Sequence, residues 1–314
     1  TPDGYRHMDG FGSHTFSLVN AAGERVWVKW HFKTGQGIRN LMADQAVRLA
    51  GTDPDYAQRD LFDAIAAGNH PRWKVFIQVM TEQDRVQWEQ RTGWNAFDLT
   101  KVWPHKDFPR IPVGVLELHR NPDNYHADVE QAAFSPANVV PGLGYSPDKM
   151  LQGRLFAYHD AQLYRVGTNH QQLPVNRPRC PFHHQQRDGA MSIHNGSAFA
   201  SNYDPVQAAG TDPRGFGHGD PGWQISGVAG RYDPRGIEDD FTQAGNLFRL
   251  LPADERDRLT TNVANSLAGV TVPATIERQL AHFAKADPAY GAEVARKLQD
   301  KRGGASVTVA KTAA

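Results

Sequence analysis

The chain has 314 residues, enough for one large domain or two smaller ones, and its 34 lysines and arginines balance its 34 aspartates and glutamates. This balance gives no basic surface of the kind that nucleic-acid binding needs, and the single cysteine, Cys180, excludes a disulfide framework. No apolar run reaches the length of a membrane span.

The first 120 residues combine strands with helices. From Arg25 to Thr34 the side chains alternate, with Val28 on one face and Trp27 and Lys29 on the other, which predicts a strand that follows a hairpin turn. Asp53 and Gly68 are suited to cap the two ends of a helix. The expected elements are a hairpin over 15–34, helices over 36–49 and 54–67, and strands over 73–80 and 111–119.

Residues 121–235 are rich in Pro, Gly, Asn, Asp and His and show little periodicity. Such a long irregular segment is uncommon in a compact domain unless it is functional or lies against another surface. Within it we expect one helix, over 148–162. The 20 prolines and 29 glycines of the chain agree with much irregular backbone.

The helical period returns after residue 235. Helices are expected over 239–251, 253–267, 274–286 and 288–301, and residues 303–314 are expected to form a frayed tail. The apolar residues expected to form the core of these helices are Leu247, Leu250, Leu251, Leu259, Val263, Leu267, Ile276, Leu280, Phe283, Val294 and Leu298.

A tyrosine between two arginines is the main chemical signal. Arg154 precedes Tyr158 by four residues and Arg165 follows it by seven, so a helix would present all three on one face. A guanidinium beside a phenol favours the phenolate form, and phenolate is an axial ligand of haem iron. The run therefore indicates a metal-bound cofactor. The alternative is a half-buried helix tyrosine on which an arginine stacks.

Several segments of the chain resemble the monofunctional haem catalases, and the resemblance spans residues 2–300. The segments that carry it are Arg6–Phe16, Phe97–His105, Arg120–Pro122, Met150–Tyr158 and Gln172–Asn176. It implies an α+β fold with a catalase-like antiparallel β-barrel, of which the second half is present here, a long wrapping loop and a C-terminal helical region. The corresponding domains would be 1–120, 121–235 with the proximal haem helix, and 236–302, followed by the tail 303–314.

The resemblance assigns roles to individual residues. It implies that Tyr158 is the proximal ligand of haem iron, with Arg154 as its charge partner, and that Arg165 binds a haem propionate through its planar guanidinium. Gln162 stands where many members have a histidine near the haem edge. Further haem-pocket positions are matched by Met150, Phe134, Ala157, Leu99, Ser13 and His14. For the apolar residues and for His14, the alternative is that they are ordinary core residues. For Arg165, the alternative is a solvent-exposed charge on the face of a helix.

Some catalases also bind NADPH at a surface site. The matching positions are Asp9, Phe11, Lys33, Trp103 and His105. A lysine suits a phosphate and an aromatic ring suits stacking, but the family often has a tyrosine where this chain has Phe11. The alternative is a partly exposed sheet edge on which a tryptophan packs. NADPH binding therefore stays open, as does the type of haem, b or d.

The resemblance implies disproportionation of hydrogen peroxide to water and oxygen by a cytoplasmic homotetramer, with the periplasm as the open alternative. The family's distal histidine and asparagine have no match here, because the only His-Ala pair, His126-Ala127, continues as Asp128-Val129 rather than as His-Ala-x-Gly. The chain therefore resembles the C-terminal part of a catalase. Since that histidine moves the proton between the peroxide oxygens, we expect Thr1–Ala314 alone to be inactive. Two other hypotheses stay open, namely a non-catalytic haem-binding fragment and a catalase-fold enzyme acting on fatty-acid hydroperoxides.

Overall fold

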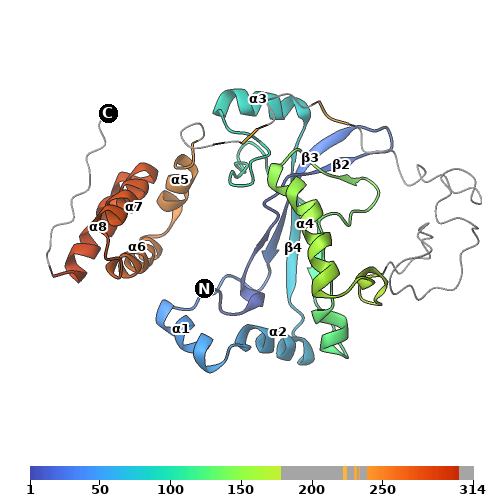
Figure 1. Cartoon of the computed structure of the whole chain (residues 1–314), viewed down its shortest axis with the longest axis horizontal. Coiled ribbons are helices and arrows are strands. Elements are labelled where there is room, and N and C mark those ends of the chain that lie inside the picture. Colours follow the sequence, from blue (N-terminus) through green and yellow to red (C-terminus); the bar gives the residue numbers. More distant parts are fainter. Residues whose placement is uncertain (178–221, 225–229, 232, 234–238, 304–314) are drawn as a thin grey trace, which may run out of the picture. The chain divides into compact units, whose positions relative to one another are not determined.

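The computed structural model describes residues 1–177, 222–224, 230–231, 233 and 239–303, and these form two compact units (Figure 1). One unit is made of Thr1–Leu99 and Trp103–Val228, and the other of Thr100–Val102 and Ala229–Ala314, which includes the C-terminal helices. Cys180, much of the predicted loop and the predicted tail from 304 lie outside the described residues. The predicted division at 120 and 235 stays a prediction. No helix in the described part of the chain is long and apolar enough to cross a membrane.

The first unit is built on an antiparallel sheet of order β5-β4-β3-β2-β6, in which β1 also pairs with β3. The strands are β1 Gly10–Phe11, β2 Phe16–Val19, β3 Arg25–Thr34, β4 Arg72–Met80, β5 Ile111–Glu117 and β6 Leu143–Gly144. The predicted hairpin is confirmed, because β2 pairs with β3 and places Phe16 opposite Val28. Strands β1 and β6 were not predicted, since two residues carry no alternation.

The helices of the first unit are α1 Ala43–Thr52, α2 Tyr56–Ala66, α3 Glu82–Thr92 and α4 Lys149–Arg165, and shorter helical turns lie at Tyr5–His7, His126–Glu130 and His170–Gln172. The prediction of a helix over 36–49 was wrong at its start. Leu41 donates its backbone N–H to the carbonyl of Thr1 (2.8 Å) and Arg39 accepts from Asp3 (2.9 Å), so this stretch bonds to the N-terminal residues instead.

The helix predicted after Asp53 begins slightly later, at Tyr56, and ends before Gly68, which has the positive φ of 79° expected after a helix. The helix predicted over 148–162 is confirmed as α4, which continues to Arg165. Helix α3 was not predicted at all.

Aromatic residues cover the face of the sheet on which Trp27 lies. The buried cluster consists of Trp27, Met80, Trp88, Ala96, Trp103 and Phe108. Lys29 points to this same face and is buried, with its Nζ 5.3 Å from the centroid of the Trp103 ring. Val28 on the opposite face is fully buried too, so this part of the sheet is covered on both sides. Burial lowers the pKa of Lys29 to about 8.

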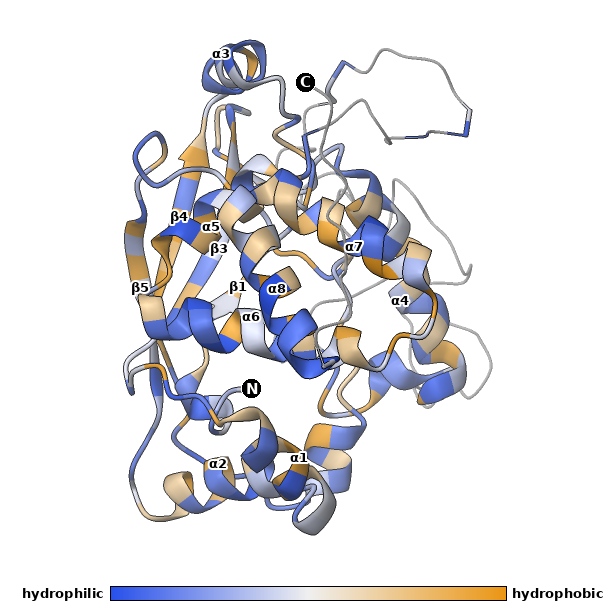
Figure 2. Ribbon diagram, turned by 90° about the vertical axis from the view of Figure 1, so that its left-hand side faces the viewer, coloured by the Kyte–Doolittle hydropathy of each residue, from blue (hydrophilic) through white to orange (hydrophobic). Residues whose placement is uncertain are grey.

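Strand β5 differs from the other long strands because it lies at the end of the sheet order and is exposed on both faces. Figure 2 shows it as a largely hydrophobic strand. Its exposed apolar residues are Ile111, Val113, Val115 and Leu116. Pro112 occurs within it, as edge strands allow, since proline cannot donate a ladder hydrogen bond.

The second unit contains α5 Thr242–Leu250, α6 Ala253–Ala268, α7 Pro273–Ala286 and α8 Pro288–Lys301, close to the predicted ranges. Its core holds Ala264, Leu267, Ile276, Leu280, Val294, Ala295 and Leu298. The prediction that Leu247 and Leu250 are core residues was wrong, because they are 61% and 80% exposed. Helix α5 buries the face of Gly245 and Phe248 instead, and these leucines lie on its other side.

Candidate functional site

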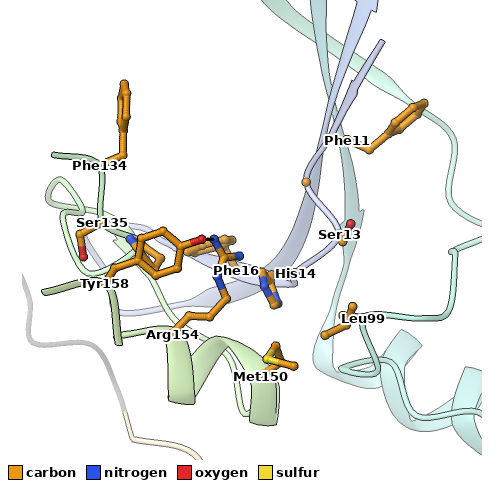
Figure 3. A pocket seen from close by; sticks show the side chains of 12 residues that line it. Phe11, Ser13, His14, Phe16, Leu99, Phe134, Ser135, Met150, Arg154 and Tyr158 are labelled. Atoms are coloured by element: carbon orange, nitrogen blue, oxygen red, sulfur yellow. Dashed lines mark hydrogen bonds between the residues drawn. The ribbon is translucent and has the colours of Figure 1, made fainter. Parts of the chain in front are cut away.

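A cavity of about 580 Å³ lies beside the N-terminal part of α4 (Figure 3). Its volume falls in the range of about 300–1,000 Å³ that is usual for small-molecule and cofactor pockets. Its walls come from the chain between β1 and β2, from Leu99, from the segment 134–136 and from α4. The lining residues are Phe11, Gly12, Ser13, His14, Phe16, Leu99, Phe134, Ser135, Pro136, Met150, Arg154 and Tyr158.

Helix α4 contributes Met150, Arg154 and Tyr158, which are spaced four residues apart and so share one face. The helix begins at a defined N-cap, because Asp148 Oδ1 accepts the backbone N–H groups of Met150 (2.9 Å) and Leu151 (3.1 Å). Leu151 is fully buried on another side of the helix. The cap and this anchor fix which face of α4 turns toward the cavity.

Arg154 and Tyr158 interact directly, as the dashed line in Figure 3 marks. Nη2 of Arg154 donates to the Tyr158 hydroxyl oxygen at 2.8 Å, and the guanidinium carbon lies 4.6 Å from the centroid of the same ring. The Tyr158 side chain remains accessible, at 36% exposure. The phenol oxygen of Tyr158 therefore accepts a charge-assisted hydrogen bond at the cavity wall.

His14 and Asp148 form a buried pair beside this tyrosine site. His14 Nδ1 lies 2.6 Å from Asp148 Oδ2, and Asp148 is only 2% exposed. Because a carboxylate oxygen can only accept here, Nδ1 carries the proton. The same carboxyl group therefore caps α4 and orients a cavity-lining histidine. His14 is both a hydrogen-bonded buried histidine and a wall of the cavity.

The structure brings most of the predicted haem-pocket residues together. Those that line the cavity are Ser13, His14, Leu99, Phe134, Met150, Arg154 and Tyr158. Ala157 and Arg165 are not among its lining residues. Sequence reasoning did not single out Gly12, Phe16, Ser135 and Pro136, although Gly12 and Phe16 lie within one of the segments that carried the resemblance.

Arg165 bonds to its own chain. Its Nε donates to Gln162 Oε1 (2.7 Å), and its two terminal nitrogens donate to the carbonyls of Glu130 (3.0 Å) and Ala132 (2.7 Å). These bonds use three of the five N–H donors of a guanidinium, so donors are left for a carboxylate. The predicted propionate contact stays a prediction.

Four of the five predicted NADPH residues gather around His31. Lys33 pairs with Asp9 and lies over the Phe11 ring, and the His31 ring is 5.9 Å from the rings of both Phe11 and His105. Burial, followed by the charges of Arg110 and Lys33, lowers the pKa of His105. Trp103, the fifth, is 1% exposed, and its ring belongs to the core. NADPH binding itself is not tested by this arrangement.

Family models match almost the whole chain. The model described as "Catalase" matches residues 1–210, and the model described as "Catalase-related immune-responsive" matches residues 235–298. The match to the first covers the sheet, the cavity and α4.

Individual relatives agree with the family models. The chain is 57% identical over 297 residues to "Catalase A" of Pseudomonas putida and 50% identical over 305 residues to "Catalase" of Helicobacter pylori strain J99; each alignment covers 95% of this chain and 61% or 59% of the relative. The chain thus spans about three fifths of the length of the curated relatives it matches.

Solved structures show the same relationship. "Structure of a bacterial catalase" superposes with a TM-score of 0.84 at 40% identity, covering 96% of this chain and 61% of that one. "Catalase A from Saccharomyces cerevisiae" superposes with a TM-score of 0.84 at 37% identity, covering 95% and 62%. These superpositions confirm the predicted catalase-like α+β fold.

Proposed function

The chain belongs to the catalase family, and on that premise we propose that it forms the proximal side of a haem site that disproportionates hydrogen peroxide to water and oxygen. The observation that carries this proposal is the hydrogen bond from Arg154 to Tyr158 at the wall of a cofactor-sized cavity. An accessible phenol oxygen beside a guanidinium is the arrangement that a tyrosine ligand of ferric iron requires.

The cavity suits haem by its chemistry. Apolar side chains that can pack on a flat macrocycle line it, namely Phe16, Leu99, Phe134 and Met150. Tyr158 would hold the iron, and Ser13, His14 and Ser135 add polar groups to the lining. Haem, when bound, would supply the redox-active iron that gives two electrons to one peroxide molecule and recovers two from a second.

Residues of this chain position and stabilise the phenol oxygen of Tyr158 that would bind the iron. Tyr158 presents the phenol oxygen, and Arg154 donates to it and so stabilises its negative charge. The Asp148 carboxylate fixes the start of the helix that carries both and also holds His14. In this proposal the hydrogen bonds of Asp148 and Arg154 orient the groups that would face the haem.

The finer assignments are part of the same proposal. Arg165 would bind a propionate with its remaining donors, and the protein would work as a cytoplasmic homotetramer. NADPH, if the protein uses it, would bind at Asp9, Phe11, Lys33 and His105. The activity is proposed for the whole protein, and the expectation that Thr1–Ala314 alone is inactive stays a prediction.

Titration of the purified chain with ferric haem tests the proposal. We expect one haem to bind per chain, with a visible spectrum typical of tyrosinate-ligated ferric iron. A chain that takes up no haem, or takes it up without saturation at one equivalent, would contradict the proposal. Oxygen evolution from hydrogen peroxide, measured on the same preparation, tests separately whether this chain alone is inactive.

A further inference from the structure

One wall of the cavity depends on a short segment that side chains from other elements hold in place. Residues Phe134, Ser135 and Pro136 line the cavity, and the four residues before them, 130–133, lead out of the helical turn at His126–Glu130. Phe134 is 82% exposed, so packing of its ring does little to fix its position. The backbone bonds of segment 130–134 must therefore set where this wall stands.

Asn176 makes three hydrogen bonds around this segment. Its Oδ1 accepts the backbone N–H of Ala133 at 2.7 Å, and its Nδ2 donates to the carbonyls of Gln131 and His170, both at 2.9 Å. The amide orientation is fixed, because the oxygen has to face an N–H and the NH₂ group has to face two carbonyls. Asn176 thus ties segment 130–134 to the turn at His170–Gln172.

Gln162 of α4 holds the next peptide. It is buried, its Nε2 donates to the carbonyl of Phe134 at 3.0 Å, and its Oε1 accepts from Arg165. Arg165 in turn donates to the carbonyls of Glu130 and Ala132. The side chains of Asn176, Gln162 and Arg165 together bond to four of the five backbone carbonyls of segment 130–134. The exception is the carbonyl of Ala133, whose backbone N–H is bonded to Asn176 instead.

We propose that Asn176 is a positioning residue of the cavity, which together with Gln162 fixes the backbone that carries the Phe134 wall and so sets the shape available to the ligand. It acts through this backbone and does not line the cavity itself. Where the ligand is haem, the inference rests on the proposed function. It also gives a role to the segment Gln172–Asn176, whose resemblance to the family had no chemical explanation.

The chemistry of Asn176 suggests a graded set of variants. Asn176→Ala removes all three bonds. Asn176→Asp keeps the acceptor for the Ala133 N–H but turns a second oxygen toward two carbonyls, and therefore loses the two donated bonds. Asn121→Ala is the matched control, because Asn121 also donates its amide to a backbone carbonyl, that of Phe62 at 2.9 Å, without touching segment 130–134.

Hydrogen exchange on the full chain without haem tests the first half of the inference. We expect the Ala133 amide to exchange about tenfold faster in Asn176→Ala, since its acceptor is gone, and to exchange as in the unmodified chain in Asn121→Ala. Circular dichroism confirms that each variant is folded. Unchanged exchange at Ala133 in the folded Asn176→Ala variant would overturn the inference.

Ferric haem titration tests the second half. We expect haem to bind about tenfold more weakly to Asn176→Ala and with a shifted spectrum, Asn176→Asp to be affected in the same direction, and Asn121→Ala to bind as the unmodified chain does. In a Phe134→Ala background the effect of Asn176→Ala should largely disappear, because the wall it positions is already gone. An undiminished effect in that background, or an unchanged affinity despite faster exchange, would overturn the positioning role.

The hydrogen-exchange and haem-titration experiments together distinguish a failure of this inference from a failure of the proposed function. If the unmodified chain binds no haem, the proposed function fails, whereas the exchange at Ala133 still decides whether Asn176 holds the segment. If the unmodified chain binds haem and Asn176→Ala behaves like Asn121→Ala in both measurements, the proposed function stands and the inference about Asn176 is wrong.

Discussion

Arg154 donates from Nη2 to the hydroxyl oxygen of Tyr158 at 2.8 Å, while its guanidinium carbon lies 4.6 Å from the centroid of the same ring. One cation therefore contacts both the face and the oxygen of the tyrosine. The contact is local, since the two residues are one helical turn apart on α4. On this contact rests the proposal that Tyr158 binds the haem iron.

Replacing Arg154 tests how much this contact contributes. Arg154→Ala should weaken ferric haem binding by roughly 10- to 100-fold, because a charge-assisted hydrogen bond contributes about 1.5–3 kcal/mol. Arg154→Lys should retain part of the affinity, since it keeps the charge but loses the planar group that stacks on the ring. Absorbance titrations with ferric haem measure both, and equal affinities for all three proteins would contradict the prediction.

Replacing Asp148 tests its double role as helix cap and partner of His14. Asp148→Ala should lower the free energy of unfolding by about 1–3 kcal/mol, since it removes a cap and leaves a buried histidine without its acceptor. Asp148→Asn should lose about 1 kcal/mol less, because asparagine is an equally good N-cap. Urea unfolding followed by circular dichroism gives both values. Equal losses would mean that the cap contributes little.

The lowered pKa of Lys29 should make the free energy of unfolding depend on pH. Its pKa falls from 10.5 to about 8, chiefly because burial disfavours the charged amine, while Asp148 and Asp98 act in the opposite direction. Between these pH values the unfolded chain binds more protons than the folded chain, so the contribution of Lys29 to stability rises with pH across this window. At about 1.4 kcal/mol per pH unit, the shift corresponds to roughly 3 kcal/mol.

The variant Lys29→Met removes this titration. The free energy of unfolding of Lys29→Met minus that of the unmodified chain should be greatest below pH 8. This difference should fall by up to about 3 kcal/mol as the pH rises to 10.5. Urea unfolding of both proteins at several pH values measures the difference, in which the titration of all other lysines cancels. A difference that stays constant from pH 7 to 10.5 would argue against a lowered pKa for Lys29.

The contact between Gly245 and Ala286 limits substitution in the second unit. A Cβ atom on Gly245 would lie 1.9 Å from the Ala286 carbonyl oxygen, so the backbone would have to move. Gly245→Ala should therefore destabilise this unit by about 1–3 kcal/mol. Gly51→Ala in α1 is the control, because nothing lies within 4 Å of its added Cβ, and it should stabilise by up to about 1 kcal/mol. Thermal unfolding distinguishes the two, and a neutral Gly245→Ala would contradict this packing.

The sequence predicted the long strands and most helices because their patterns are local. Helix α3 was not predicted, although the sequence contains the residue pair that caps its N-terminus. Thr81 and Asp84 bond reciprocally, each accepting the other's backbone N–H at 3.1 Å, and this spacing is a recognised start signal. The start of α1 could not have been predicted in this way, because the distant residues Thr1 and Asp3 determine it.

In the site, too, contacts between residues close in sequence could be predicted, and contacts between residues far apart in sequence could not. Arg154 and Tyr158 could be paired from their spacing alone. By contrast, the link between His14 and Asp148 spans 134 positions, and the bonds from Asn176 to Gln131 and Ala133 span more than 40. Leu247 and Leu250 follow a helical period, but the periodicity does not say which face a neighbouring helix covers.

Titration of Tyr158→Phe with ferric haem decides whether the Tyr158 oxygen binds the iron. Phenylalanine keeps the ring and removes only the oxygen, and the exposed Tyr164 on the same helix provides a matched Tyr164→Phe control. We expect Tyr158→Phe to lose stable ferric haem binding and the tyrosinate spectrum, while Tyr164→Phe retains both. A Tyr158→Phe protein with unchanged affinity and spectrum would show that another residue binds the iron.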